Sequence, residues 1–140
     1  MKSSAHFLSS LILAGILYPI LNWKVLIILV GGVLIDIDHY FWYVYKYHEI
    51  NFFKSYFFYL EKMNARNFTD VNGILLIFHT GEFLLPMIIL SFYSEWASMF
   101  TIGLLLHHFM DLIYLYTVPK RFVVNHSVVY WIFKNKIQKI

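Results

Sequence analysis

The chain has 140 residues, of which 60% are hydrophobic and 21% aromatic, while only 14% are charged. A soluble domain of this length is nearer half apolar and about a quarter charged, so the composition argues against a soluble protein and predicts one domain in a membrane. Because the chain contains no cysteine, disulfide bonds, thiolate metal sites and a cysteine nucleophile are excluded.

Four apolar segments, each close to the ~20 residues needed to cross a bilayer, follow one another along the chain. They cover about residues 5–22, 25–45, 73–93 and 97–119. The first follows Lys2 like a signal peptide, but it lacks a cleavage site of small residues, so a retained anchor is predicted. The connectors after the first and third segments are very short. The predicted fold is therefore all-α: a four-transmembrane-helix bundle of two antiparallel hairpins, forming a single domain over residues 1–140.

Between the two hairpins, residues 46–72 combine basic and aromatic side chains. The apolar residues recur there at helical spacing: Phe52, Phe53, Tyr56, Phe57, Leu60 and Met63. This pattern predicts an amphipathic helix that lies on the lipid bilayer rather than crossing it. The tail, residues 120–140, has a similar character and is predicted to lie at the same surface.

The basic residues are distributed unequally across this topology. Of the eleven Lys and Arg residues, only Lys24 falls on the side opposite the termini. Basic residues mark the cytoplasmic side of membrane proteins, so both termini and the long loop are predicted to be cytoplasmic, in a cell membrane or inner membrane. The same rule explains the position of the lysines, so they do not indicate nucleic-acid binding. No nucleic-acid partner is expected.

Four acidic residues and four histidines lie inside the predicted spans. They are Asp36, Asp38, Glu82 and Asp111, with His39, His79, His107 and His108. An ionised aspartate at a helix centre costs ~2.5–3.5 kcal/mol on insertion scales, so four uncompensated carboxylates would cost about 10–14 kcal/mol. The last three spans contain no Lys or Arg near these acids. The carboxylates are therefore protonated, paired with histidinium, or bound to a metal ion.

The spacing of these residues groups them on the cytoplasmic side of the predicted bundle. Asp36 and His39 are three residues apart, as are His79 and Glu82, so each pair shares a helix face. The second span runs inward and the third starts at the cytoplasm, which brings the two pairs to a similar depth. His6, at the cytoplasmic mouth of the first span, adds a further ligand-type side chain.

The fourth span contributes His107, His108 and Asp111. Asp111 follows the two histidines at i,i+4 and i,i+3, so it shares a helix face with either of them. His107 and His108 are ~100° apart around the helix, so only one of them is expected to face the first site. Asp38 points about 160–200° away from Asp36, which makes it either a hydrogen-bond partner of a ligand or a ligand of another metal.

Imidazole and carboxylate donors without thiolate suit Zn²⁺, Mn²⁺ or Fe²⁺, with zinc as the first expectation. The candidate ligands are His6, Asp36, His39, His79, Glu82, His107, His108 and Asp111. Three protein ligands are typical of a catalytic zinc, so this set serves one or two ions. An acid left over, Asp38 or Glu82, is predicted to act as general base. The isolated His48 and His126 are expected to be polar residues at the interface.

These motifs resemble those of the YdjM-like family of predicted membrane-bound metal-dependent hydrolases. The matching elements are His6, "DIDH" at 36–39, His79 and "HHFMD" at 107–111. The family commonly has a proline where this chain has Ile35, and its central motif has a second histidine where "HTGE" offers Glu82. The H-x-x-x-D spacing is also similar to that of the helical zinc phospholipases C and P1-type nucleases, an analogy that points to phosphoester chemistry.

The resemblance implies a membrane-embedded hydrolase that uses its metal on a lipid or membrane-proximal ester, with a phosphoester as the first candidate. The main alternative is a non-enzymatic carrier of metal ions or protons, which would use the same residues and would form its pathway as an oligomer. In two further alternatives, the histidines only hydrogen-bond across the bundle, or the basic face docks a partner.

Overall fold

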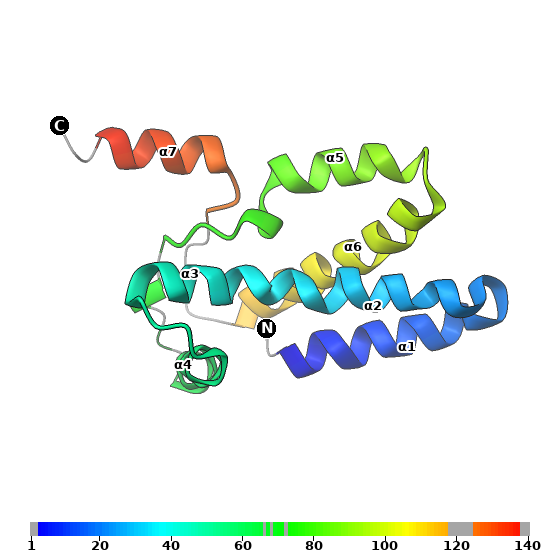
Figure 1. Ribbon diagram of the computed structural model, residues 1–140, viewed down its shortest axis with the longest axis horizontal. Coiled ribbons are helices and arrows are strands. Elements are labelled where there is room, and N and C mark those ends of the chain that lie inside the picture. The colour runs from blue at the N-terminus through cyan, green and yellow to red at the C-terminus, as the bar shows by residue number, and fades with distance from the viewer. Residues whose placement is uncertain (1–2, 66, 68, 72, 118–124, 138–140) are drawn as a thin grey trace.

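The computed structural model describes residues 3–65, 67, 69–71, 73–117 and 125–137. The predicted all-α fold is confirmed for these residues (Figure 1). The α-helices are α1 (Ser3–Leu21), α2 (Leu26–Val33), α3 (Ile37–Tyr47), α4 (Phe52–Ala65), α5 (Gly81–Ser91), α6 (Glu95–Thr117) and α7 (Val128–Ile137). Four 3₁₀ turns lie between them: η1 (Asn22–Val25), η2 (Leu34–Asp36), η3 (Thr69–Val71) and η4 (Ile77–His79).

Two helical stretches of the described chain are long and apolar enough to cross a membrane. One runs without a break from Ser3 to Tyr47, and the other lies in α6, from Glu95 to Tyr116. The first stretch reverses direction at Asn22, whose φ is 51°, so α1 lies antiparallel to the arm formed by α2, η2 and α3 (Figure 1). The first, second and fourth predicted spans therefore correspond to helical arms of the structure.

The third predicted span, residues 73–93, is wrong as a continuous helix. Only Gly81–Ser91 is α-helical there, a length of about 16 Å, which is half of the ~30 Å hydrocarbon core. The helix cannot extend backwards because Thr80 has an extended backbone, with φ −92° and ψ 154°. Residues before Thr80 form a loop that ends in the short turn η4.

This loop is held by a segment near the C-terminus, residues 125–129, which we call the C-terminal strap. The Asn125 backbone N–H donates to the carbonyl of Ile74 at 3.1 Å. The Asn125 side-chain amide, itself buried, donates to the carbonyls of Gly73 and Ile74. Buried backbone N–H and C=O groups need hydrogen-bond partners. The loop is not helical, so the strap provides several of the partners that a helix would otherwise provide.

We expect Asn125→Ala to loosen the loop that carries His79, because the half-buried Gly73 carbonyl loses its donor and the Ile74 carbonyl keeps only the backbone N–H of residue 125. A buried unpaired group costs about 1–3 kcal/mol. Hydrogen exchange should therefore show faster exchange of the amides of residues 73–81, with α2 and α6 unchanged. The control is Asn64→Ala, at an exposed position of α4. Equal exchange of the loop in both variants would contradict the role given to the strap.

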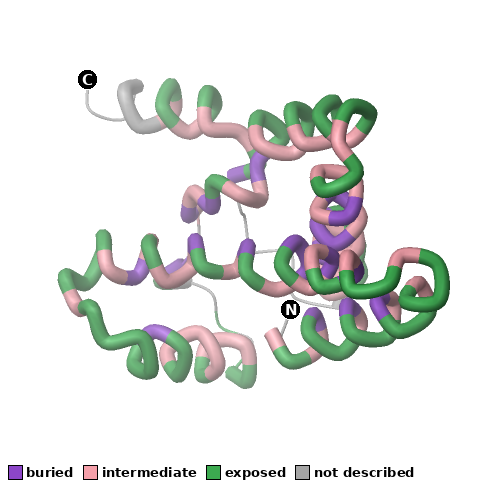
Figure 2. Tube along the Cα trace, turned by 45° about the vertical axis from the view of Figure 1, so that its right-hand side comes forward, coloured by how far each residue is buried: buried purple, intermediate pink, exposed green. Residues whose placement is uncertain are grey.

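The tightest packing in the bundle is the crossing of α2 and α6. A Cβ atom on Gly31 would collide with the backbone carbonyl of Phe100, and one on Gly103 would collide with that of Ile28. Glycine at both positions lets the two backbones touch, as in helix pairs of membrane proteins. Figure 2 shows buried residues gathered where these two helices meet.

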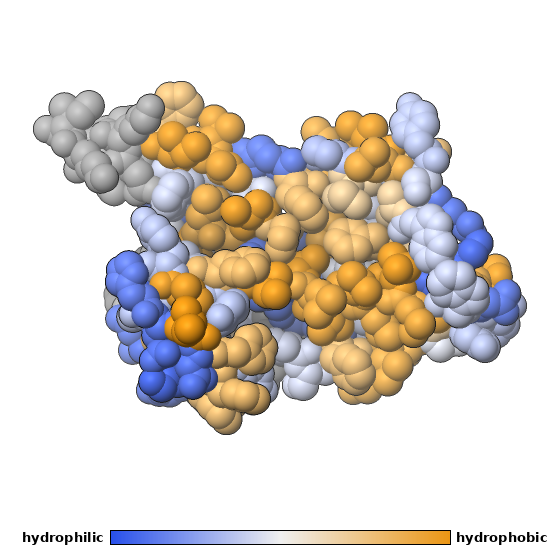
Figure 3. All heavy atoms as spheres, in the orientation of Figure 1, coloured by the Kyte–Doolittle hydropathy of each residue, from blue (hydrophilic) through white to orange (hydrophobic). Residues whose placement is uncertain are grey.

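Helix α1 directs its small and polar residues inward and its large apolar residues outward. His6, Ser10 and Ala14 are buried at intervals of one turn. On the outer side, Ile12 is 55% and Ile16 67% exposed. This is the reverse of a helix on the surface of a soluble protein. Figure 3 shows apolar side chains over the middle of the molecule, with hydrophilic ones near the α3–α4 turn and near the α1–α2 turn.

The amphipathic segment predicted at residues 46–72 contains α4, and the tail contains α7. Helix α4 is seen end-on in Figure 1, so it runs across the direction of α1 to α3.

Lys54 is paired with Glu49 at 2.5 Å, which neutralises part of the basic face. Several side chains behind the predicted orientation lie outside the described part of the chain: Lys2, Arg66, Lys120, Arg121, Lys136 and Lys139, as do residues 118–119 of the fourth span. The orientation stays a prediction.

Candidate metal centre

Five of the predicted ligands lie together where α1, η2, η4 and α6 meet. They are His6, Asp36, His79, His107 and Asp111, which we call the His/Asp cluster. Their side-chain nitrogen and oxygen atoms form two overlapping groups, His6–His107–Asp111 and Asp36–His79–His107, and within each group the atoms lie within 4.8 Å of one another. Residues that are more than a hundred positions apart in sequence, such as His6 and Asp111, therefore present ligand atoms to one small volume.

Five distances among four atoms of this cluster are close to those that a small tetrahedral ion sets, whereas Asp36 and Asp111 fall in different ligand groups. The Nε2 atoms of His79 and His107 are 3.1 Å apart. Asp36 Oδ1 lies 3.9 and 3.5 Å from these two nitrogens. Asp111 Oδ2 lies 3.6 and 3.3 Å from them. A tetrahedral zinc with bonds of 2.0–2.1 Å holds its ligand atoms about 3.3–3.4 Å apart.

The orientation of the two imidazoles indicates which nitrogens face each other. His107 Nδ1 lies 2.9 Å from the Gly32 carbonyl oxygen, and His79 Nδ1 lies 3.0 Å from Asp38 Oδ2. A carbonyl and a carboxylate only accept, so both Nδ1 atoms carry the proton. In neutral rings both Nε2 atoms then carry lone pairs, and they face each other at 3.1 Å. A cation between them, either a metal ion or a shared proton, removes the repulsion.

Two other buried nitrogens around the cluster, Nδ1 of His6 and Nε2 of His108, make no hydrogen bond. Nε2 of His6 and Nδ1 of His39 instead face carboxylate oxygens, at 3.1 Å from Asp111 and 3.2 Å from Asp38. Each buried unpaired polar atom costs about 1–3 kcal/mol, so two of them in one place are unusual in a purely structural network. One shared proton satisfies a single pair of nitrogens. The donor set, with nitrogen and oxygen but no sulfur, is one that could hold a divalent metal ion.

His6 and Asp111 extend the cluster toward α1. The His6 ring stacks on that of His107, with centroids 3.7 Å apart and an interplanar angle of 11°. His6 Nε2 lies 3.1 Å from Asp111 Oδ1, whereas Asp111 Oδ2 faces His79 and His107. Because Nδ1 of His107 is engaged by Gly32, this imidazole has a single nitrogen for a metal. One ion is thus the simplest occupancy, and a second would rest on His6 and Asp111 Oδ1.

Asp38 lies behind His79, on the opposite side of the ring from Asp36. It is 5% exposed, and its Oδ2 accepts hydrogen bonds from His79 Nδ1 and from the Phe78 backbone N–H at 3.1 Å. A carboxylate in this position fixes the tautomer and the direction of a metal-binding imidazole. Of the two roles left open by the sequence, the contact matches the hydrogen-bond partner of a ligand.

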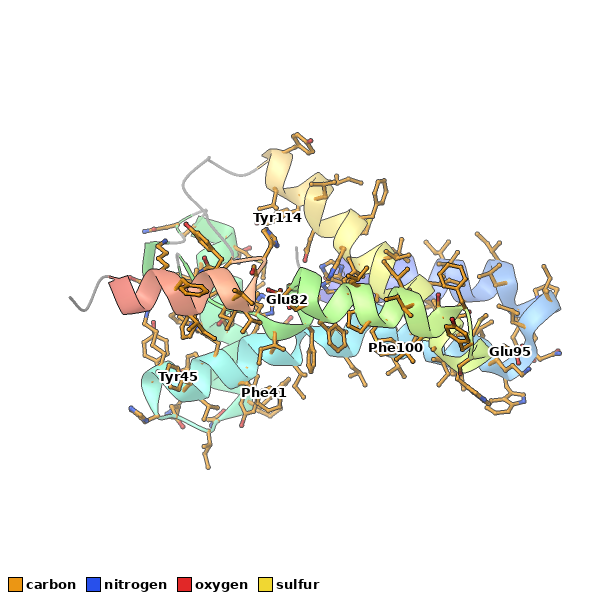
Figure 4. All side chains as sticks on the ribbon, turned by 90° about the horizontal axis from the view of Figure 1, so that it is seen from above. Phe41, Tyr45, Glu82, Glu95, Phe100 and Tyr114 are labelled. Carbon is orange, nitrogen blue, oxygen red and sulfur yellow. The ribbon has the colours of Figure 1, made fainter. Side chains whose placement is uncertain are left out.

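Glu82 is not brought to the cluster. Its side chain is exposed, and Oε1 accepts hydrogen bonds from the Ser127 hydroxyl at 2.6 Å and from the Val129 backbone N–H at 3.4 Å. Figure 4 shows Glu82 where α5 begins, close to the start of α7. The expectation that His79 and Glu82 share a helix face is wrong, because extended Thr80 interrupts the helix between them. Glu82 instead links α5 to the C-terminal strap.

A cavity of about 600 Å³ opens beside the His/Asp cluster. Its polar end includes Asp36, His79 and Asp111, together with His39 and His108, which face the cavity without joining either ligand group. The His108 ring stacks on His79, with centroids 5.4 Å apart. A second hollow, of about 410 Å³, lies around the α1–α2 turn, where Lys24 and Glu95 pair at 2.6 Å. Glu95 is the acid of this second hollow, and it is already paired with Lys24. We therefore place the candidate site at the His/Asp cluster.

The rim of the larger cavity is fixed by Tyr59 of α4. Its hydroxyl donates to the carbonyl of His39 at 3.1 Å. Burial raises the pKa of the Tyr59 phenol, and the negative charge of Asp38 raises it further. The phenol therefore remains neutral, and it keeps donating, at any physiological pH. This bond ties α4 to the start of α3 next to the cluster.

Three contributors to the site were missed by sequence reasoning. The Gly32 carbonyl orients His107, but a backbone oxygen has no signature in a sequence. Asn125 holds the His79 loop from a distant part of the chain. His126, expected at the interface, lines the cavity with Nδ1 3.5 Å from the His79 carbonyl. The one sequence signal for Asn125 and His126 is that residues 125–127 are a polar run within an apolar tail.

No protein family, no curated protein and no solved structure matches this chain. The likeness to the YdjM-like family therefore stays a prediction that the short motifs carry.

Proposed function

We propose that the chain is an integral membrane protein whose His/Asp cluster binds a divalent metal ion and hydrolyses a lipid-borne or membrane-proximal ester, with a phosphoester as the first candidate. The observation that carries the proposal is the pair of Nε2 atoms of His79 and His107, which face each other at 3.1 Å while both Nδ1 atoms donate elsewhere. The motif resemblance points the same way.

The membrane location is supported by the surface of the helices. Large apolar residues are exposed along α1, while its buried positions are small or polar. Two stretches of the described chain are long and apolar enough to cross. The loop before α5 fits this setting as well, because non-helical backbone is tolerated at membrane depth where protein buries it. We therefore treat α1 to α3 and α6 as crossing helices and α5 as a half-length helix beside them.

In this proposal Asp36, His79, His107 and Asp111 would hold the ion. A bound divalent ion supplies Lewis-acid activation of the ester and of water. Asp38 and the Gly32 carbonyl keep the two imidazoles in the binding tautomer, which is the role of outer partners in metal sites. The cavity lets the ester reach the cluster from one side, while α1 and α2 cover the other.

The test of function is turnover of bis-p-nitrophenyl phosphate by the protein in mild detergent, loaded with zinc or manganese. The proposal expects metal-dependent turnover that Asp36→Asn abolishes and that Glu61→Gln, at an exposed position of α4, leaves intact. Ion flux in proteoliposomes, lost in Asp36→Asn and without turnover, would replace the hydrolase by the carrier. Activity of either kind that is unchanged in Asp36→Asn would contradict both.

We expect Asp38→Ala to weaken metal binding without abolishing it, because it removes the acceptor that orients His79 rather than a ligand. Loss of such a partner typically lowers metal affinity ~10–100-fold. Competition with a chromophoric zinc chelator measures the change. Asp38→Asn, which keeps an acceptor oxygen, should lose less, and the exposed Asp70→Ala should lose nothing. Complete loss in Asp38→Ala would instead make Asp38 a ligand.

A further inference from the structure

The cavity beside the His/Asp cluster is lined by the polar residues of the cluster and by many apolar side chains. The apolar ones come from α3, α4 and α6 and include Ile37, Met63 and Leu115. Its floor contains Val71, Ile74 and Leu76, which are all at most 2% exposed and form one packed apolar group. A ligand that fills this space therefore has a polar group at the cluster and an apolar remainder.

Two of the tyrosines that line the cavity, Tyr40 and Tyr59, have hydroxyl groups that are already engaged in hydrogen bonds. The Tyr40 hydroxyl donates to the Ile50 carbonyl at 2.8 Å, and the Tyr59 hydroxyl donates to the His39 carbonyl at 3.1 Å. A sugar or a peptide inside the cavity would need several polar partners along its length. The wall does not offer them at these two positions, whereas a hydrocarbon chain needs none.

The volume limits the number of chains. A volume of about 600 Å³ lies within the range of about 300–1,000 Å³ that is typical of pockets for one drug-sized ligand. This is enough for an ester head and one long hydrocarbon chain. A lipid with two long chains would have to leave one of them outside.

Helix α4 separates this cavity from the surroundings of the protein. Phe52, Tyr56 and Met63 line the cavity, while Phe53 and Phe57 are 70% and 60% exposed on the other side. A helix that is apolar on both sides fits a position at the membrane surface, between the lipid and the apolar cavity. A single-chain amphiphile could then pass from the bilayer into the cavity beside α4.

We infer that the cavity binds the one hydrocarbon chain of a single-tailed amphiphile, whose ester group lies against the His/Asp cluster. The inference rests on the proposed function for the fate of the ester, but the chain site stands on the shape and lining of the cavity. The substrate class is therefore a lyso-type lipid or a similar monoalkyl ester rather than a two-chain phospholipid.

Photolabelling of the full chain in phosphatidylcholine nanodiscs tests this. One probe is a lysophosphatidylcholine with a diazirine at the end of its chain, and the other is a two-chain phosphatidylcholine with the same diazirine. We expect the lyso probe to label Met63 and Leu115, and the two-chain probe to label only exposed residues such as Phe57. Met63→Trp should lower lyso labelling of Leu115 about tenfold by filling the cavity, while Phe57→Trp should leave it unchanged.

The outcomes separate the two proposals. Labelling of the cavity in Asp111→Asn, which removes a proposed ligand, should persist although turnover is lost. Labelling by the lyso probe that is confined to outer residues, or equal labelling of Leu115 by both probes, would overturn the chain site and leave hydrolysis untouched. If Met63→Trp does not fold, the labelled positions in the wild type decide the question alone.

Discussion

Replacing Asp111 by Asn is expected to lower the affinity for zinc more than about 100-fold, while Glu82→Gln leaves it unchanged. Losing an outer partner of a ligand costs ~10–100-fold in metal affinity, and the loss of a charged ligand should exceed this. Asp111 Oδ2 lies 3.3 and 3.6 Å from the two facing imidazole nitrogens, and Oδ1 lies 3.1 Å from His6.

The pair of variants is informative because both residues are acids in apolar helices and both were candidates from the sequence. Glu82 bonds to Ser127 and Val129 instead, so Glu82→Gln should only weaken the link to α7. Chelator competition on both variants, beside thermal unfolding to establish that they fold, measures the difference. Equal loss in the two variants would return Glu82 to the ligand set and would contradict the geometry described above.

The second large effect is expected from Gly103→Ala, which should destabilise the bundle by the upper end of the ~1–3 kcal/mol range for overpacking. The added Cβ would meet the Ile28 carbonyl and the Gly32 backbone nitrogen. Backbone atoms cannot move aside as a flexible side chain can, so α2 and α6 must separate. The same separation would lengthen the bond from His107 to the Gly32 carbonyl, one helical turn further on.

The matched control for this variant is Gly15→Ala in α1, where a Cβ would have nothing within 4 Å. It should be neutral, or slightly stabilising through helix propensity. Thermal unfolding in detergent, followed by circular dichroism, measures both variants, and zinc affinity measures the coupling to the site. Wild-type stability and zinc affinity in Gly103→Ala would contradict the close contact between the backbones of α2 and α6 described above.

The sequence predicted most of the residues that gather in the His/Asp cluster, for a physical reason. Carboxylates inside apolar segments are costly, so Asp36 and Asp111 had to have partners, and histidines at helical spacing supplied them. The same reasoning failed for Glu82, because it assumed an unbroken helix from His79 onward. The apolar run "GILLIF", residues 73–78, has the hydropathy of a membrane helix, and hydropathy alone does not reveal that a distant strap holds it in a loop.

The helical arms were predicted for a similar reason, since a run of about twenty apolar residues has few alternatives to a helix in a membrane. What the sequence could not provide was the set of backbone and long-range partners. The Gly32 carbonyl behind His107, and Asn125 behind the His79 loop, act through geometry that appears only when the chain is folded.

The most direct test of the account is elemental analysis of the wild-type protein, purified in mild detergent without added metal and again after incubation with zinc or manganese and desalting. We expect about one equivalent of a divalent ion per chain, retained through desalting and absent in Asp36→Asn. No ion above the detergent blank, even after incubation, would contradict it. The facing imidazoles would then share a proton, and the cluster would be a hydrogen-bonded core of the bundle or a path for protons.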